Sequence, residues 1–414
     1  MMFPLQATSE PGRRFVTMME AHAAEFAQSA AELDRQGRFA AENVRALCDS
    51  GALAAAVPVE LGGLGVESLY ELGLAVSRLA RGDASTAIAS WMHLIATHMM
   101  ASAYRALLAR GKAPAAQRLE RTLRGVAHER QIIAVLASEA GTYADYPQTR
   151  ALRDGDGYRI DGTKVFGTMA QAASLLNVAL QLDAEDGTRC FGYALIPRAT
   201  PGVTINDDWD ALGMRASGSG SVSLSGCRVP ADAVSVLGEL GKETVAGLLL
   251  PLGRNVGLLG ACIGIAEAAR EQAIALANGR KKLPSNRTAG ERVLIQEQLG
   301  EIDVTLNAVR ATFAYSSRAI DDAQASLQPR SVQLSDARQL VAAIDTAKIF
   351  VERGCVQVVD RCLSVSGGSG YLAKSPLSRH YRDVRALSFM FPQASETVQY
   401  IGMVALGLEP KLDL

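Results

Sequence analysis

The hydrophobic pattern of this 414-residue chain changes its period twice, and that change limits the folds the chain can adopt. From residue 13 to about residue 127, apolar residues recur three and four positions apart, as on amphipathic helices. Near Arg130 the pattern becomes strand-like, and after Pro230 the helical spacing returns and lasts to the end of the chain. This uncommon order predicts three domains: a helical one at 1–129, a β domain at 130–234 and a helical bundle at 235–414.

The middle segment has the signals of a compact β domain. A strand-like apolar run covers 132–136, and the sequence Asp-Gly-Asp-Gly at 154–157 is a strong turn signal that predicts a hairpin within 150–168. Segment 191–197 reads as a further strand. Segment 221–225 alternates polar and apolar residues, as a half-buried strand does.

Long helices rich in small residues are expected on both sides of the β domain. They are predicted at about 84–109, 257–275, 288–324 and 333–366. Gly260, Ala261 and Gly264 fall on one of them and would let neighbouring helices approach closely. The predicted fold class is therefore α+β, mainly α.

Charge argues against a nucleic-acid partner. Lys plus Arg total 42 and Asp plus Glu total 43, so no basic surplus is present to neutralise phosphates. The N-terminal segment lacks a basic region followed by an apolar one, and the longest apolar run, 256–266, is about half of what a membrane span needs. We therefore expect a cytoplasmic protein without a membrane segment.

The cysteines do not have the spacing of a metal site. None of the six forms a C-x-x-C pair, which argues against zinc and against a redox dithiol, so no metal is expected. Scattered cysteines are typical of a reducing cytoplasm, where they act as small core residues.

Four segments in order resemble motifs of the acyl-CoA dehydrogenase superfamily of flavoproteins. They are ASEAGTYAD at 137–145, DGTKVFGT at 161–168, LGMRAS at 212–217 and GGSGY at 367–371. Each motif alone is weak, but the four together cover essentially the whole chain. The resemblance implies an N-terminal helical domain, a central β-barrel and a C-terminal four-helix bundle, usually in a homotetramer.

The resemblance places the flavin ring on the first two motifs. An isoalloxazine ring needs hydrogen-bond partners at its polar edge and hydrophobic walls for its body. Position by position, the partners would be Ala137, Ser138 and Thr168, and Phe166 would wall the ring. The alternative is that Ser138 and Thr168 are ordinary strand hydroxyls.

The remaining cofactor contacts implied by the family are Gly367, Gly368 and Arg280. The double glycine would approach the pyrophosphate, often that of a neighbouring subunit, or could simply end a helix. Arg280 and the loop at 283–287 match the family's Arg motif only loosely. FAD is the expected cofactor, with reduced FMN as the alternative.

The carboxylate base of the dehydrogenases is missing. The resemblance places that base at Pro392 or, in a minority of the family, at Gly253, and neither side chain can accept a proton. Segments 295–302 and 375–384 look more like the two-component flavin monooxygenases of this superfamily. Those enzymes take reduced flavin from a separate reductase and oxygenate their substrates through a flavin C4a-peroxide.

Few residues remain as candidates for the substrate side. Phe389, Met390 and Phe391 would furnish a dry pocket, although each could be helix core, and Trp209 could wall the same cavity or fill the barrel. His93, on the small-residue helix, is the candidate acid–base group, although a lone helical histidine is more often structural.

The sequence therefore predicts a flavin-dependent oxidoreductase that monooxygenates a small organic substrate. The alternative is an acyl-CoA or acyl-carrier dehydrogenase that oxidises the Cα–Cβ bond and transfers hydride to FAD N5. A third reading is a flavin-binding protein without catalysis.

Overall fold

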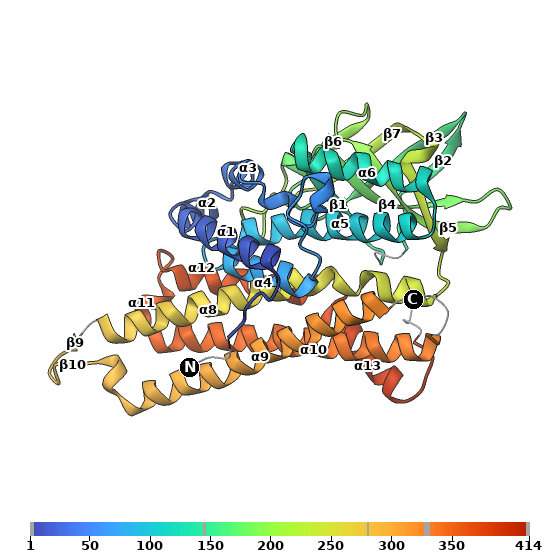
Figure 1. Ribbon diagram of the computed structural model, residues 1–414. Coiled ribbons are helices and arrows are strands. Elements are labelled where there is room, and N and C mark those ends of the chain that lie inside the picture. The colour runs from blue at the N-terminus through green and yellow to red at the C-terminus, as the bar shows by residue number, and fades with distance from the viewer. Residues whose placement is uncertain (1–3, 144–145, 280, 327–331, 411–414) are drawn as a thin grey trace.

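The computed structural model describes residues 4–143, 146–279, 281–326 and 332–410, and its elements follow the predicted helix–strand–helix order (Figure 1). The small-residue helix expected at 84–109 is present with those limits, and Asp83 caps it by accepting the N–H of Ser85 at 3.1 Å. The N-terminal elements are α1 (Glu10–Phe26), α2 (Ala30–Gln36), α3 (Ala41–Asp49), η1 (Ala52–Ala54), η2 (Val59–Leu61), α4 (Leu69–Ala80), α5 (Ala84–Ala109) and α6 (Ala113–His128).

The middle of the chain forms a mixed eight-stranded sheet around a hydrophobic core of its own. The predicted hairpin is confirmed, with Asp154 paired to Gly157 and Gly155 in the left-handed region at φ 63°. The order is β6-β7-β3-β2-β4-β5-β8, with β1 parallel to β4. The strands are β1 (Ile133–Leu136), β2 (Arg150–Asp154), β3 (Gly157–Lys164), β4 (Leu175–Asp183), β5 (Arg189–Pro197), β6 (Val203–Ile205), β7 (Val222–Pro230) and β8 (Val234–Glu239), with short helices η3 (Ala170–Ala172) and η4 (Ala231–Ala233).

The C-terminal part is a bundle built on three long helices. The helix expected from 288 begins at Val293, because the preceding residues form a small hairpin that ends in a capping box at Thr288 and Glu291. The elements are α7 (Val245–Leu249), η5 (Leu250–Asn255), α8 (Val256–Gly279), β9 (Lys281–Lys282), β10 (Arg287–Thr288), η6 (Ala289–Glu291), α9 (Val293–Ser326), α10 (Leu334–Ser366), α11 (Gly368–Tyr371), α12 (Pro376–Asp383), η7 (Ala386–Phe389) and α13 (Ala394–Ala405).

The two helical parts share one core, because α4 and α8 pack at very close range. A Cβ added at Gly260 would lie 2.2 Å from the carbonyl oxygen of Gly73, and one at Gly264 would lie 2.1 Å from that of Ser77. The segment Val245–Gly279 is apolar and long enough to cross a membrane, but 72% of its most apolar window is buried inside the protein. It therefore serves as the central core helix, as the spacing of its small residues predicts.

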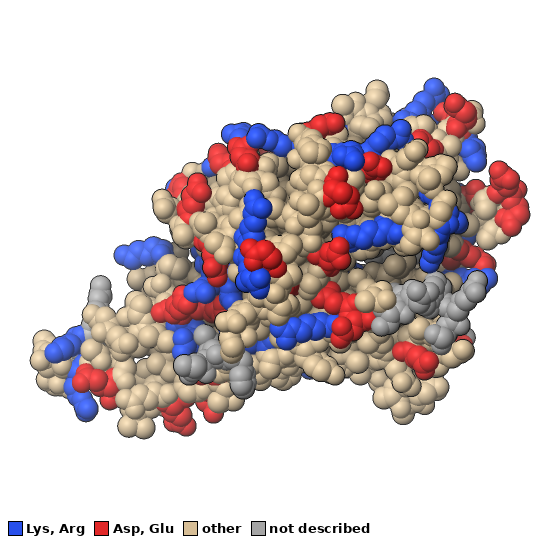
Figure 2. Space-filling model, viewed as in Figure 1, with Lys and Arg blue, Asp and Glu red and all other residues tan. Residues whose placement is uncertain are grey.

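The thiols lie in these cores. Every cysteine except Cys48 is buried, and all six are free. Burial raises the pKa of Cys262 and of Cys362 to about 12. Over the visible face of the molecule, acidic and basic side chains alternate over short distances (Figure 2).

Candidate functional site

The fold brings the first two motifs side by side at one end of β3. The N–H of Val165 donates to the carbonyl of Ser138 at 3.0 Å. A buried ion pair of 2.5 Å between Lys164 and Glu139 fixes the same contact. Burial alone would raise the pKa of Glu139, but hydrogen bonds from Lys164 and from Thr149 lower it below its ordinary value. Ala137 and Ser138 are half-buried beside the second motif, and their contact with a cofactor stays a prediction.

Thr168 lies in a row of three buried hydroxyls. Its Oγ1 is 2.9 Å from Oγ of Ser219, which is 2.6 Å from Oγ of Ser217. Backbone hydrogen bonds hold the two segments together, from Gly167 to the carbonyl of Gly220 and from Met169 to that of Ser217. The two contacts within the row use two of its three O–H protons, so one proton remains to donate to a polar ring edge.

Phe166 stands exposed next to this row. Its backbone has φ 55°, its side chain is 60% exposed, and its ring meets that of Trp209 edge-on at 6.1 Å. The indole N–H of Trp209 donates to the carbonyl of Met214 at 3.0 Å, so this ring is fixed in place. An exposed aromatic surface beside hydroxyl groups fits a flat ring with a polar edge, and the residues present therefore suit a flavin.

The loop that carries Ser217 and Ser219 is fixed from the C-terminal bundle. The N–H of Met214, at φ 52°, donates to Oδ1 of Asp383 on α12 at 2.7 Å. Next to it, Arg382 binds Asp34 of α2 at 2.9 Å. Arg382 and Asp383 thus serve as structural connections between α12, α2 and this loop.

His93 is held on both sides by the backbone. Its Nδ1 accepts the N–H of Ile133 at 3.0 Å and its Nε2 donates to the carbonyl of Leu53, also at 3.0 Å. Complete burial lowers its pKa to about 4, so the ring is neutral near pH 7. Both ring nitrogens of His93 therefore already have partners, which argues against the acid–base role considered for it. Its role is structural, because these two hydrogen bonds connect α5 to η1 and to β1.

The double glycine lies at the end of α10, in a part of the bundle away from the sheet (Figure 1). Gly367 has φ 58°, both glycines are exposed, and an added Cβ at either would meet no atom within 4 Å. Within one chain they are not brought to Thr168, so their predicted cofactor contact stays a prediction that needs a second subunit. Arg280 lies outside the described residues.

Phe389, Met390 and Phe391 follow α12 and have different environments. Phe389 is 69% exposed, Met390 packs on the bundle core, and the ring of Phe391 lies 4.6 Å from the guanidinium of Arg254. Because Arg254 follows Gly253 and Phe391 precedes Pro392, this contact places the two family positions for a base next to each other. Among the described aromatic rings, that of Trp209 pairs with Phe166, so a pocket shared by Trp209 and these three residues stays a prediction.

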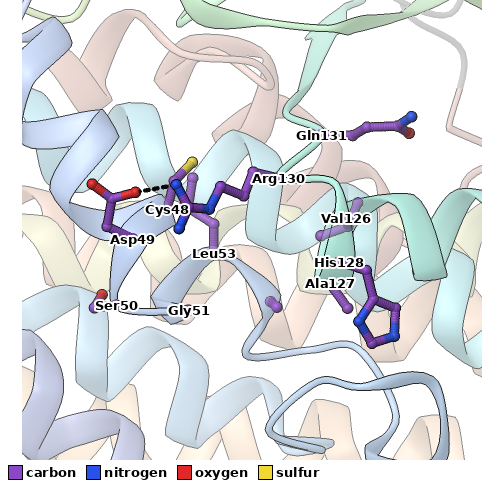
Figure 3. A pocket seen from close by; sticks show the side chains of 11 residues that line it. Cys48, Asp49, Ser50, Gly51, Leu53, Val126, Ala127, His128, Arg130 and Gln131 are labelled. Atoms are coloured by element: carbon purple, nitrogen blue, oxygen red, sulfur yellow. Dashed lines mark ion pairs between the residues drawn. The ribbon is translucent and has the colours of Figure 1, made fainter.

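A separate cavity of about 350 Å³ lies on the N-terminal domain (Figure 3). An ion pair of 2.6 Å between Asp49 and Arg130 crosses it, and His128 and Gln131 line its other side. None of the predicted cofactor residues contributes to this cavity, which is distinct from the site beside Phe166.

Sequence reasoning missed Ser217 and Ser219 as members of the site. Ser217 ends the third motif, so the motif itself was a signal for it. Ser219 reaches Thr168 only through the closure of the loop between β6 and β7, 51 positions further along the chain.

Comparisons with protein families match all three parts of the chain. The N-terminal domain of acyl-CoA dehydrogenase matches residues 10–110, the middle domain matches residues 134–227 and the C-terminal domain matches residues 257–391. The matched segments follow the boundaries between the helical and β parts.

Individual relatives extend over nearly the whole chain. The amino sugar nitrososynthase RubN8 of Streptomyces rubradiris is 34% identical, over 97% of this chain and 92% of the relative. The solved structure of KijD3 in complex with FMN and dTDP-3-amino-2,3,6-trideoxy-4-keto-3-methyl-D-glucose is 32% identical, with a TM-score of 0.89 over 98% of this chain and 96% of that one. TdsC of Paenibacillus sp. A11-2, solved with FMN and indole, is 25% identical, with a TM-score of 0.81 over 95% and 97%.

Proposed function

The chain belongs to the acyl-CoA dehydrogenase family and is a flavin-dependent oxidoreductase of the monooxygenase type, and from that premise we propose that it oxidises the amine of a nucleotide-linked amino sugar. The relatives that support this proposal are the nitrososynthases, at 33–34% identity over at least 96% of the chain. In an amine oxidation of this kind the nitrogen is converted to a hydroxylamine and then to a nitroso group.

The observation that carries the proposal is the absence of a carboxylate at both base positions. An added Cβ at Gly253 would lie 2.5 Å from Cδ1 of Leu69, so a longer side chain has no room there. Pro392 offers only its backbone carbonyl, which accepts a hydrogen bond of 3.0 Å from Nζ of Lys348. Removal of an α-proton from a thioester needs a free base near pH 7, which neither position provides.

Each part of the site has a role in holding the cofactor. Thr168 and Ser219 would bind the polar edge of the ring, with Ser138 in the loop after β1, and Phe166 with Trp209 would cover its apolar body. Bound reduced flavin supplies two electrons for each molecule of O₂, so that one oxygen atom reaches the substrate nitrogen and the other leaves as water. Burial of the hydroxyls and the aromatic cover keep bulk water away from the ring edge.

We further propose reduced FMN as the form used, delivered by a separate reductase. FMN is the flavin in the KijD3 and TdsC structures. Because FMN lacks the adenine half, it does not depend on the weakly matched Arg280 region. The predicted cytoplasmic location provides the NADH that such a reductase requires.

A homotetramer remains a proposal supported by exposed groups on the bundle. Leu283, in the hairpin that projects from the bundle end (Figure 1), is 88% exposed, and Tyr371, beside the double glycine, is 83% exposed. A second subunit packed against this end of the bundle would cover both side chains. Light scattering at micromolar concentration tests this proposal, and a monomer would contradict it.

The function is tested by supplying reduced FMN through a reductase and NADH, in air, with a dTDP-3-amino-sugar. Mass spectrometry should detect conversion of the amine to the hydroxylamine and the nitroso sugar, and the matching 3-hydroxy sugar should not react. In a parallel anaerobic sample, acyl-CoA thioesters should leave bound FAD oxidised. Bleaching of FAD by an acyl-CoA, with no change in the amino sugar, would establish the dehydrogenase instead.

A further inference from the structure

A carboxylate that the site description has not used lies next to the two vacant base positions. Asp345 lies on α10, one helical turn before Lys348, and Lys348 binds the carbonyl of Pro392 at 3.0 Å. On the other side, Arg254 stacks on the ring of Phe391. The charges of Arg254, which follows Gly253, and of Lys348, which binds the carbonyl of Pro392, both act on Asp345.

The carboxylate of Asp345 forms no direct hydrogen bond or ion pair with the described residues, although the charges of Arg254 and Lys348 act on it. Its neighbours are engaged elsewhere, since Lys348 also pairs with Glu352 at 3.3 Å and Arg254 stacks on an aromatic ring. The side chain is half-buried and therefore still open to a small molecule. A half-buried carboxylate without a partner is costly for the protein and usually has a function.

Two more polar groups lack partners among the described residues, one that interacts with Asp345 and one that follows Arg254 in the chain. The hydroxyl of Tyr400 on α13 and the side-chain oxygen of Asn255 in η5 are buried without a hydrogen bond. Burial raises the pKa of Tyr400 well above its ordinary value, and the negative charges of Glu243 and Asp345 raise it further. These two buried oxygens, together with the carboxylate of Asp345, can accept hydrogen bonds from a ligand rich in N–H donors, such as an ammonium group.

We propose that Asp345 is the catalytic residue that binds the substrate's ammonium group and removes its proton, an inference that rests on the proposed amine oxidation. The amine arrives as R–NH₃⁺. One N–H bond breaks, its electron pair stays on nitrogen as the lone pair, and the proton joins a carboxylate oxygen of Asp345. Only the resulting R–NH₂ has a lone pair that can attack oxygen, so this step precedes the oxidation.

The electrostatics of the pocket suit such a proton acceptor. Burial raises the pKa of Asp345 above its ordinary value, and the nearby charges of Arg254 and Lys348 oppose this rise only in part. The other titratable groups around it are Tyr400, Glu243 and Arg338, the last two at the far side of the tyrosine. A carboxylate with a raised pKa is a better acceptor for an ammonium proton than an exposed aspartate.

The test measures binding to the flavin-free protein by titration calorimetry. Wild-type protein should bind a dTDP-3-amino-sugar about 10- to 100-fold more tightly than the 3-hydroxy analogue near pH 7, as expected for a hydrogen bond between charged groups. Asp345→Asn should lose this preference and keep the affinity for the hydroxy analogue. Asp360→Asn is the matched control, since it removes an exposed carboxylate from the same helix.

Turnover provides a second measurement. With reduced FMN, Asp345→Asn should be slow near pH 7 and approach the wild-type rate at about pH 9, where the amine loses its proton to water. Asp345→Ser should behave alike, and thermal unfolding should verify that both variants fold. An unchanged amine preference and pH profile in both would overturn this inference while leaving the proposed function intact. Failure of the wild type to bind or oxidise any amino sugar would instead overturn the proposed function, and this inference with it.

Discussion

Asp383 accepts the backbone N–H of Met214 at 2.7 Å, and this hydrogen bond joins residues 169 positions apart in the sequence. It connects α12 of the C-terminal bundle to the loop that carries Ser217 and Ser219. The hydroxyl side of the proposed flavin site is therefore positioned by a buried carboxyl group that belongs to another domain. The protonation state of that carboxyl group should affect both stability and cofactor binding.

Asp383→Asn should flatten the pH dependence of stability. Burial raises the pKa of Asp383 to about 7, whereas an unfolded aspartate has a pKa of about 3.9. The raised pKa therefore adds to the free energy of unfolding. This stabilisation is fully present below about pH 4 and is lost as the pH rises through 7. Thermal unfolding of wild type against variant between these pH values should show a difference that grows towards low pH. Parallel curves would contradict a buried titrating Asp383.

Loss of the hydroxyl row should weaken flavin binding. Thr168→Val and Ser219→Ala each remove a hydrogen-bonding group while keeping the shape of the site, at a cost of about 0.5–1.5 kcal/mol, or roughly 2- to 10-fold in FMN affinity. Thr163→Val, at an exposed position on β3, is the matched control. FMN affinity is measured by fluorescence titration. Equal affinity in the wild type and all three variants would show that the cofactor does not bind at the second motif.

Tryptophan fluorescence should report flavin binding through one residue. The chain has two tryptophans, of which Trp91 is fully buried and Trp209 meets the exposed ring of Phe166. FMN should quench the wild-type emission in a saturable titration, and Trp209→Phe should remove most of that quenching. Persistence of the full quenching in the variant would mean that flavin binds elsewhere.

His93→Leu should lower stability and leave the chemistry intact. The substitution deprives the N–H of Ile133 and the carbonyl of Leu53 of their partners, at about 1–3 kcal/mol for each buried group. Thermal unfolding should shift to lower temperature, while turnover per folded protein should stay at the wild-type level. A large loss of turnover with an unchanged unfolding temperature would restore an acid–base role.

Acidification should destabilise the wild type through the same histidine. Because burial lowers the pKa of His93 to about 4, the folded state keeps the ring neutral while an unfolded histidine takes up a proton near pH 6.5. The stabilisation that the neutral ring gives the folded state is present above pH 6.5 and is lost as the pH falls through about 4. His93→Leu should lack this component, so the stability difference between the two proteins should shrink in acid. A difference independent of pH would contradict a buried neutral ring.

Local sequence patterns were sufficient to predict helices and strands, but they were insufficient to predict which residues meet in the candidate site. The spacing of small residues predicted the limits of α5, and the turn signal at Gly155 predicted the hairpin. Both predictions succeeded because these structures depend on residues that are close in sequence. The role of His93 could not be read in this way, since its partners Leu53 and Ile133 lie 40 positions away on either side. Asp345 lies within a helix predicted only from its apolar face, and nothing in that segment indicates its proximity to Pro392.

The buried thiols have a consequence for an enzyme that handles reduced flavin in air. Some of the reducing equivalents in such a reaction escape as hydrogen peroxide, which attacks thiolates rather than thiols. Cys262 and Cys362, with pKa values of about 12, stay protonated and enclosed at any physiological pH. The central helices should therefore survive prolonged uncoupled turnover without sulfenic acid formation, and oxidative damage should begin at the partly exposed Cys48.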